Sequence, residues 1–315
     1  EEYWSITATL SKGTKETTFE AELIRVNNKK VKISKEEQAK EILEKLKSVD
    51  FIVSDVVEKE RKRTPAPPFT TSTLQQEASR KLGFTARKTM SLAQELYEGL
   101  DIGADGTVGL ITYIRTDSTR VAEEAQLAAA NYIQDKYGKE FLPNKPPIYK
   151  KKGAVQDAHE AIRPTSVVRE PKVLKSHLKR DQYRLYKLIW ERFVASQMKP
   201  AIFDTVTINI GAGDYLFRAT GSIMKFPGFM MVYTEGRDDE GEEKEKSLPQ
   251  VKKDEKLIVT KLVPAQHFTK PPSPYTEAML VKAMEENGVG RPSTYAPTID
   301  TILRRGYVVL QKKRL

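Results

Sequence analysis

The 315-residue sequence contains no cysteine, which excludes disulfide bridges and zinc sites built from cysteine thiolates. No apolar run approaches the roughly 18 residues of a membrane-spanning helix. The amino end, EEYWS, lacks the features of a signal peptide and starts abruptly, as if cut from a longer chain. A phosphate-binding glycine loop is also missing, so the sequence does not indicate use of ATP. We therefore expect a cytoplasmic protein with no membrane partner.

Basic residues outnumber acidic ones, with 53 lysines and arginines against 43 aspartates and glutamates, which gives a formal charge of +10. This excess favours a polyanionic partner such as nucleic acid. The chain is 39% hydrophobic and 30% charged, as expected for a folded globular protein, and it is long enough for two or three domains.

Strand-like and helix-like patterns divide the chain. β-branched and aromatic residues with turn signals between them fill residues 1–66 and 199–272, whereas residues 67–198 show helical periodicity. The simplest interpretation is a discontinuous β-rich domain into which a helical domain is inserted. Residues 273–315 hold two short helical patterns and then a strand-like stretch, Tyr307–Leu310, an order typical of winged-helix units. The predicted fold class is α+β with several domains.

Local signals predict where individual elements begin and end. Ser34 and Glu37 have the spacing of a capping box at a helix start. A helix is expected over Ala86–Glu98, because Gly99 ends the periodic pattern. The acidic and basic run Glu235–Lys246 is expected to form an exposed loop.

The stretch Gly109–Arg120 (GLITYIRTDSTR) carries the residues best suited to chemistry. Side chains of an extended segment alternate, so Tyr113, Arg115 and Asp117 are predicted to share one face of a strand. A phenol beside a guanidinium suits phosphoryl chemistry, because the phenol supplies an attacking oxygen and the guanidinium a planar cation for the phosphate. From the residues alone, an edge strand with a half-buried tyrosine is the alternative.

The segment TYIRTDSTR resembles the catalytic-tyrosine segment of bacterial type IA DNA topoisomerases. Four further segments resemble motifs of that family, in the family's order: AQELYEG (Ala93–Gly99), AHEAIRPT (Ala158–Thr165), PAQHFTKPP (Pro264–Pro272) and GVGRPSTYA (Gly288–Ala296). The resemblance implies a β-rich arch (1–66 and 199–272) and a helical, CAP-like domain that carries the tyrosine. Residues 273–315 would then begin a further helical, winged-helix-like DNA-binding domain.

The resemblance also implies a reaction. In the family, the tyrosine oxygen attacks single-stranded DNA and becomes joined to the 5′-phosphate. A second segment passes through the break, and the 3′-hydroxyl reseals it, which relaxes negatively supercoiled DNA without ATP. By the match, Tyr113 is the nucleophile, Arg115 holds the phosphate, and His159 and Glu98 belong to the catalytic set. A free phenol has a pKa near 10, so such a nucleophile needs cationic helpers.

Further residues are implied in DNA binding by their place in the motifs. His159 and Arg163 lie four residues apart in AHEAIRPT, which would put both on one face of a helix directed at a phosphate. The other implied DNA contacts are Gln94, Asp117, Arg291, Ser293, Thr294 and Arg305, with Tyr97, Tyr295 and Phe69 as candidate stacking platforms for single-stranded bases.

One family feature is absent from this sequence. The family's Mg²⁺ site is one glutamate and a D-x-D-x-E run in a Toprim domain that precedes this region, and no such run occurs here. We therefore expect a central fragment whose Mg²⁺ is held by a missing Toprim partner domain, with no zinc in this chain.

Two other classes of protein remain as alternatives. A winged-helix DNA-binding or architectural protein would have no use for the oxygen of Tyr113. A tyrosine recombinase or a rolling-circle nuclease would need, respectively, a catalytic set rich in arginine and histidine or a metal-binding histidine pair near the tyrosine. Neither pattern is present.

Overall fold

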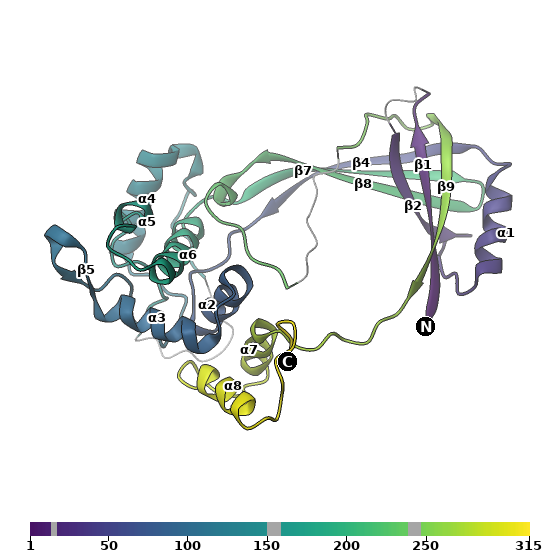
Figure 1. Cartoon of the computed structure of the whole chain (residues 1–315). Helices are drawn as coiled ribbons and strands as arrows, with labels where there is room; N and C mark the ends of the chain where they lie inside the picture. The colour runs from purple at the N-terminus through teal and green to yellow at the C-terminus, as the bar shows by residue number, and fades with distance from the viewer. Residues whose placement is uncertain (14–17, 150–158, 239–246) are drawn as a thin grey trace. The chain divides into compact units, whose positions relative to one another are not determined.

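The computed structural model describes residues 1–13, 18–149, 159–238 and 247–315 (Figure 1). The chain divides into two compact units. The sheet unit comprises Glu1–Lys62, Ile202–Phe226 and Glu243–Ser273, and the helical unit comprises Arg63–Ala201, Pro227–Glu242 and Pro274–Leu315. A mixed α/β class with a large antiparallel sheet is confirmed, whereas the arch and CAP-like domains, with a separate third domain from residue 273, stay a prediction.

The sheet unit is built on one seven-stranded sheet with the order β1-β9-β4-β7-β8-β2-β3. β1 also pairs with β2, so six strands form a closed ring of pairings and β3 is left at the edge. The strands are β1 (Glu2–Ser11), β2 (Thr18–Val26), β3 (Lys29–Lys30), β4 (Phe51–Arg63), β7 (Ala201–Ala212), β8 (Tyr215–Phe226) and β9 (Lys256–Phe268).

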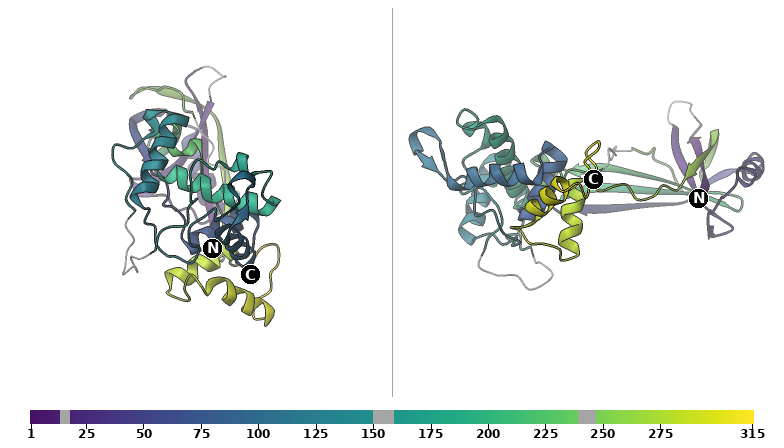
Figure 2. Two further views of the ribbon diagram at one scale, coloured as in Figure 1. Left: turned by 90° about the vertical axis from the view of Figure 1, so that its left-hand side faces the viewer. Right: turned by 60° about the horizontal axis from the view of Figure 1, so that its bottom comes forward.

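Alternation along these strands builds the core of the sheet unit, because every second side chain points inward. Ile6, Ala8 and Leu10 of β1 are fully buried, and so are Ile208 and Ile210 of β7. One helix, α1 (Glu36–Leu46), packs against β1 and β9 (Figure 2).

The start of α1 differs from the prediction. The N-cap is Lys35, whose side chain makes no capping bond, so the capping box of Ser34 and Glu37 is wrong. Instead, the side chain of Gln38 turns back and accepts a hydrogen bond from the backbone N–H of Ser34 at 3.0 Å.

The helical unit is organised around α6 (Arg180–Ser196), whose Leu185, Tyr186 and Ile189 are fully buried. The prediction of a helix over Ala86–Glu98 is confirmed. The other helices are α2 (Thr71–Glu77), which continues into a π-helical turn (Ala78–Leu82), α3 (Ala86–Glu98), α4 (Glu123–Tyr137), α5 (Pro171–Leu174), α7 (Glu277–Glu286) and α8 (Tyr295–Arg304). A small hairpin joins β5 (Leu100–Asp101) to β6 (Thr107–Val108).

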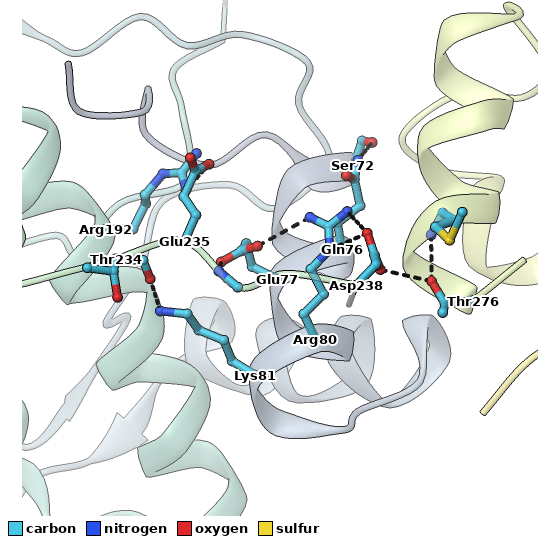
Figure 3. A network of polar contacts seen from close by, with 12 residues as sticks. Ser72, Gln76, Glu77, Arg80, Lys81, Arg192, Thr234, Glu235, Asp238 and Thr276 are labelled. Carbon is cyan, nitrogen blue, oxygen red and sulfur yellow. Dashed lines mark hydrogen bonds and ion pairs between the residues drawn. The ribbon is translucent and has the colours of Figure 1, made fainter. Parts of the chain in front are cut away.

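A polar network ties several of these elements together (Figure 3). Glu77, at the end of α2, is buried and accepts hydrogen bonds from Arg80, the hydroxyl of Tyr233 and the N–H of Gly236. Arg80 also binds Asp238 at 2.8 Å, and Asp238 accepts a bond from Thr276, the N-cap of α7.

This network adds anchoring contacts to the run Glu235–Lys246, whose described residues 235–238 form a loop with no buried member, as predicted. Burial alone would raise the pKa of Asp238, but the hydrogen bond and charge of Arg80 lower it on balance. Glu235 pairs with the buried Arg192 at 3.2 Å. The beginning of the run is therefore an anchored surface loop, and residues 239–246 lie outside the described part of the chain.

The end of the chain has no winged-helix strand. Residues Tyr307–Leu310, predicted as a strand, form a bend and irregular backbone after Gly306, which has a φ of +70°. Isolated bridges join Arg314 to Thr276 and to Gln311 instead. Across the described residues, no helix is both long and apolar enough to cross a membrane.

Candidate active site

The segment that carries Tyr113 is an irregular loop, so the predicted strand is wrong. Its one bridge joins Ile111 to Pro164. The alternation of burial nevertheless holds, because Ile114 and Thr116 are buried while Tyr113 and Arg115 are exposed. The two chemical side chains thus face solvent without being part of a sheet.

Thr71, the first residue of α2, fixes the backbone of this loop. Its hydroxyl donates to the carbonyl of Ile114 at 2.7 Å and lies 3.0 Å from the carbonyl of Thr116. The N–H of Thr116 donates to the same hydroxyl, and the N–H of Thr71 donates to the carbonyl of Thr116. These bonds fix the backbone on both sides of Arg115, in place of the hydrogen bonds to a neighbouring strand that a sheet would have supplied.

A second set of bonds fixes the loop on the other side of Tyr113. The hydroxyl of Thr112 donates to the carbonyl of Ala161 at 2.7 Å, and the N–H of Thr112 donates to the carbonyl of Arg163. A Cβ on Gly109 would lie only 2.8 Å from the carbonyl oxygen of Tyr97, so this close approach to α3 requires glycine. Tyr113 is therefore held by contacts on both sides.

Two aromatic rings flank the phenol. Tyr113 is 40% exposed, and its ring meets Tyr97 edge-on at 5.6 Å and stacks with His159 at 5.7 Å. The described part of AHEAIRPT, from His159 onward, contains no helix, so the prediction of one helical face is wrong; Ala158 lies outside the described residues. His159 nevertheless reaches the tyrosine.

Arg163 has a different environment. Its guanidinium pairs with Glu160 at 2.8 Å and donates to the carbonyl of Pro164. Burial alone would raise the pKa of Glu160, but the hydrogen bond and charge of Arg163 lower it on balance. Arg163 thus stabilises the segment that supports Thr112, and its role in DNA binding stays a prediction.

A pocket of about 620 Å³ opens beside Tyr113 in the helical unit. Three arginines, Arg87, Arg115 and Arg304, line it against a single carboxylate, Asp300, which Arg87 contacts at 3.1 Å. The remaining lining residues are Met90, Ser91, Gln94, Tyr113, Ile114, Pro292, Ser293, Ala296 and Pro297. Excess positive charge next to an exposed phenol is an arrangement suited to a phosphodiester.

Comparisons with known proteins agree with this geometry. The sequence matches the DNA topoisomerase family model over residues 1–315. The chain belongs to the bacterial type IA DNA topoisomerases. Its structure is similar to full-length topoisomerase I from Thermotoga maritima, with 37% sequence identity and a TM-score of 0.77. The match covers 100% of this chain and 48% of that protein, so the chain spans about half of its length.

Within this topoisomerase chain, the GVGRPSTYA loop leads into α8 at the pocket. The hydroxyl of Thr294 accepts a bond from the N–H of Arg291 at 2.8 Å, and Arg291 donates to the carbonyl of Gly290. Ser293 lines the pocket, whereas Arg291, Thr294 and Arg305 are exposed outside its lining.

Four residues of the candidate site were not predicted from the sequence. Arg304 lines the pocket where Arg305 was expected, and Arg87 lines it from the first turn of α3. Asp300 and the positioning residue Thr71 were also missed. None of these four lies in a motif with a chemical signature, so their places depend on tertiary structure.

The remaining predicted residues are placed as follows. Gln94 donates to Glu98 at 2.6 Å along α3, as their spacing predicted, and Asp117 is half-buried in the tyrosine loop. Phe69 is fully buried and Tyr295 is 5% exposed, so neither offers a stacking face, while Tyr97 is 39% exposed.

A divalent metal does not fit the described residues of this topoisomerase chain. They contain no group of three or more histidine, aspartate or glutamate side chains that could hold an ion. At the pocket, the one lining carboxylate, Asp300, is paired with Arg87.

Proposed function

We propose that this chain is the part of a type IA topoisomerase that cleaves one DNA strand through Tyr113 and reseals it after strand passage. The observation that carries the proposal is the exposed phenol of Tyr113 beside a pocket lined by three arginines. The net reaction is relaxation of negatively supercoiled DNA without ATP, because the bond energy of the phosphodiester is kept in the phosphotyrosine.

The chain's own residues account for much of the cleavage step. The phenol oxygen of Tyr113 forms a bond to phosphorus, the bond from phosphorus to the 3′-oxygen breaks, and the strand end leaves as a 3′-hydroxyl. The phenol proton is transferred away and the leaving oxygen gains one. Arg115 stabilises the charge that grows on the phosphate, which a permanent cation does without any change of protonation.

His159 has a role in placing the nucleophile. Its ring stacks on the ring of Tyr113, whereas Tyr97 contacts the same ring edge-on. Two ring contacts restrict the phenol, and a restricted nucleophile needs less ordering on the way to the transition state. An imidazole at this position also offers a nitrogen to the bound phosphate.

The whole enzyme's Mg²⁺ belongs, in this proposal, to a Toprim domain outside the chain, since the described residues hold no suitable ligand cluster. A bound Mg²⁺ would neutralise phosphate charge and organise the strand ends. The substrate is single-stranded at the cleavage site, and the compartment is the cytoplasm, in association with the nucleoid.

The test is a Tyr113→Phe variant in the enzyme that joins this chain to its Toprim domain. The ring contacts remain while the reacting oxygen is lost, so the covalent complex with a labelled oligonucleotide should disappear and DNA binding should stay within about twofold. Tyr97→Phe is the matched control, because it removes a hydroxyl from the neighbouring ring. A normal yield of covalent complex from Tyr113→Phe would refute the assignment.

A further inference from the structure

A second concentration of positive charge lies in the sheet unit, at the turn between β2 and β3. Asn27 and Asn28 both have positive φ, at 49° and 62°, which is the geometry of a tight hairpin turn. The segment 27–35, NNKKVKISK, holds four lysines and no acidic residue. We call the exposed side chains of Arg25, Lys29, Lys30, Lys32 and Lys35 the basic hairpin.

These five cations differ from the lysines of the neighbouring helix. Two lysines of α1 and the C-cap Lys47 bind carboxylates of the helix: Lys40 with Glu36, Lys45 with Glu41 and Lys47 with Glu44, at 2.8, 2.7 and 2.5 Å. No member of the basic hairpin forms an ion pair with any described residue. The glutamates of α1 neutralise these lysines, whereas the cations of the hairpin have no such partner.

The hairpin also contains an arrangement that is unfavourable by itself. Arg25 and Lys30 stand directly opposite each other in the β2–β3 pairing. Like charges opposite each other destabilise a pair of strands. Lysines on an edge strand do prevent unwanted strand pairing, which would explain Lys29 and Lys30 alone. An arginine opposite one of them has no such explanation, and a bound polyanion would remove the repulsion.

The surface beside the hairpin indicates which polyanion fits. A concave region of about 730 Å³ lies between the hairpin and α1. Its lining includes Lys30 and Lys32 of the hairpin, the ion pair of Lys45 with Glu41, and Asp214. The one aromatic residue in that lining, Tyr215, is only 8% exposed. Binding of single strands relies on exposed rings on which bases stack. A surface with cations and no exposed ring instead suits the continuous phosphate backbone of a duplex.

We propose that the basic hairpin is a binding site for the phosphate backbone of duplex DNA. The site is built from the sheet unit alone and uses none of the residues around Tyr113. It would let the enzyme bind double-stranded DNA at a second site, apart from the site that binds the strand to be cleaved. Because the contacts are to phosphates, binding should depend strongly on salt and little on base sequence.

The experiment compares two triple variants of the chain that remove equal charge. Duplex DNA should protect the hairpin lysines from acetylation, read by mass spectrometry, and leave Lys40, Lys47 and Lys256 reactive. Neutralising the hairpin should weaken duplex binding about tenfold or more and reduce the slope of log affinity against log salt by about two to three. The hairpin variant is Lys29→Gln/Lys30→Gln/Lys32→Gln, and the control is Lys40→Gln/Lys47→Gln/Lys256→Gln, whose lysines pair with carboxylates and lie outside the lining of the concave region.

Equal losses in the two variants would show a general charge effect and overturn the proposal. Protection by single-stranded but not duplex DNA would overturn the choice of duplex. The hairpin variant should keep or slightly raise its melting temperature, because it removes the repulsion between Arg25 and Lys30. Acetylation and binding do not depend on cleavage, so a failure of the Tyr113 assignment would leave this result interpretable.

Discussion

At the scale of single residues, the proposed function gives different roles to Tyr113, Arg115 and His159. Tyr113 carries the only phenol oxygen among the residues lining its pocket. Arg115 follows two residues later on the same exposed side of the loop, and His159 reaches the ring from a segment more than forty residues away. A guanidinium and an imidazole at these two places act on a phosphate in different ways, so their removal should differ from simple loss of binding.

We predict that Arg115→Gln and His159→Gln each slow cleavage much more than they weaken binding of single-stranded DNA. Contacts that strengthen in the transition state affect rate rather than affinity. Loss of one such contact costs about 3 kcal/mol, or roughly a hundredfold in rate. Single-turnover cleavage in the enzyme joined to its Toprim domain measures the rate, and titration of the same oligonucleotide measures binding.

Matched controls come from the same chain. Arg120→Gln removes an equal charge at the end of the same motif, and His177→Gln removes a histidine that packs near Gly103. If Arg115→Gln and Arg120→Gln reduced cleavage and binding by equal factors, Arg115 would be an ordinary phosphate contact.

At the scale of elements, α2 determines where the tyrosine loop lies. Thr71 is at the first turn of α2 and bonds the backbone on both sides of Arg115. We predict that Thr71→Val, which keeps the shape but loses the hydroxyl, lowers the free energy of unfolding by about 1–3 kcal/mol and leaves the buried N–H of Thr116 unpaired. The cleavage rate should fall by up to about a hundredfold, which is more than the loss of folded protein explains, because the loop that carries Tyr113 is displaced.

Thr89→Val tests whether the effect is specific to the loop. Thr89 is also a fully buried threonine, but its hydroxyl donates to the carbonyl of Thr85, the N-cap of α3. Urea unfolding and single-turnover cleavage of both variants should show a catalytic defect in Thr71→Val alone. Similar cleavage by both variants at matched stability would contradict a positioning role for Thr71.

The elements also show what sequence patterns can and cannot predict. The bounds of α3 followed from periodicity and Gly99, because both signals are local. The tyrosine segment had the alternation of a strand, yet its partners are Thr71 and the segment around Ala161, which no local pattern reveals. For the same reason, the prediction of a helix in AHEAIRPT was wrong. Its backbone bonds go to Thr112 and other distant residues instead of to its own preceding turn.

Ion pairs of Glu170 with Lys136 of α4 and Lys172 of α5 join these two helices and should make the free energy of unfolding depend on pH. A hydrogen bond from Lys172, with further ones from Lys136 and Tyr132, lowers the pKa of Glu170 to about 2. The unfolded value for glutamate is about 4.3. A lowered pKa means that the pair contributes stability above the unfolded value, and that this contribution is lost as the pH falls from about 4 to about 2.

We predict that Glu170→Gln reduces the free energy of unfolding by about 1 kcal/mol at neutral pH, after allowance for solvent screening of the two lysines. The difference from the unmodified chain should shrink as the pH falls below about 4. Urea titrations at a series of pH values measure it. Glu286→Gln is the control, because its pair with Lys282 is exposed on both sides. A difference that stays constant down to the acid limit would refute the assigned cause.

At the scale of the whole molecule, the proposed nucleophile lies beside positive charge, and the described residues contain no cluster of three or more side chains that could hold a metal ion. The chain spans 48% of the Thermotoga maritima enzyme to which it is similar. The function proposed above assigns Mg²⁺ to a Toprim domain outside the chain, and we predict that the complete reaction needs that domain. An unactivated phenol is a weak nucleophile, and arginines alone neutralise only part of the charge on the phosphate. We therefore expect the chain alone to bind DNA without cleaving it.

We predict that the chain Glu1–Leu315 by itself binds single-stranded DNA weakly and in a salt-dependent manner, because its contacts are to phosphates. It should neither relax negatively supercoiled plasmid nor form a stable 5′-phosphotyrosine, whatever Mg²⁺ concentration is added. Joining the Toprim domain in cis should restore both activities. The measurement is gel analysis of plasmid incubated with each protein, with the joined Tyr113→Phe enzyme as the control for contaminating activity. Relaxation by the chain alone that disappears with Tyr113→Phe would show that the chemistry is complete without the metal-binding half, and the proposed division of labour would be wrong.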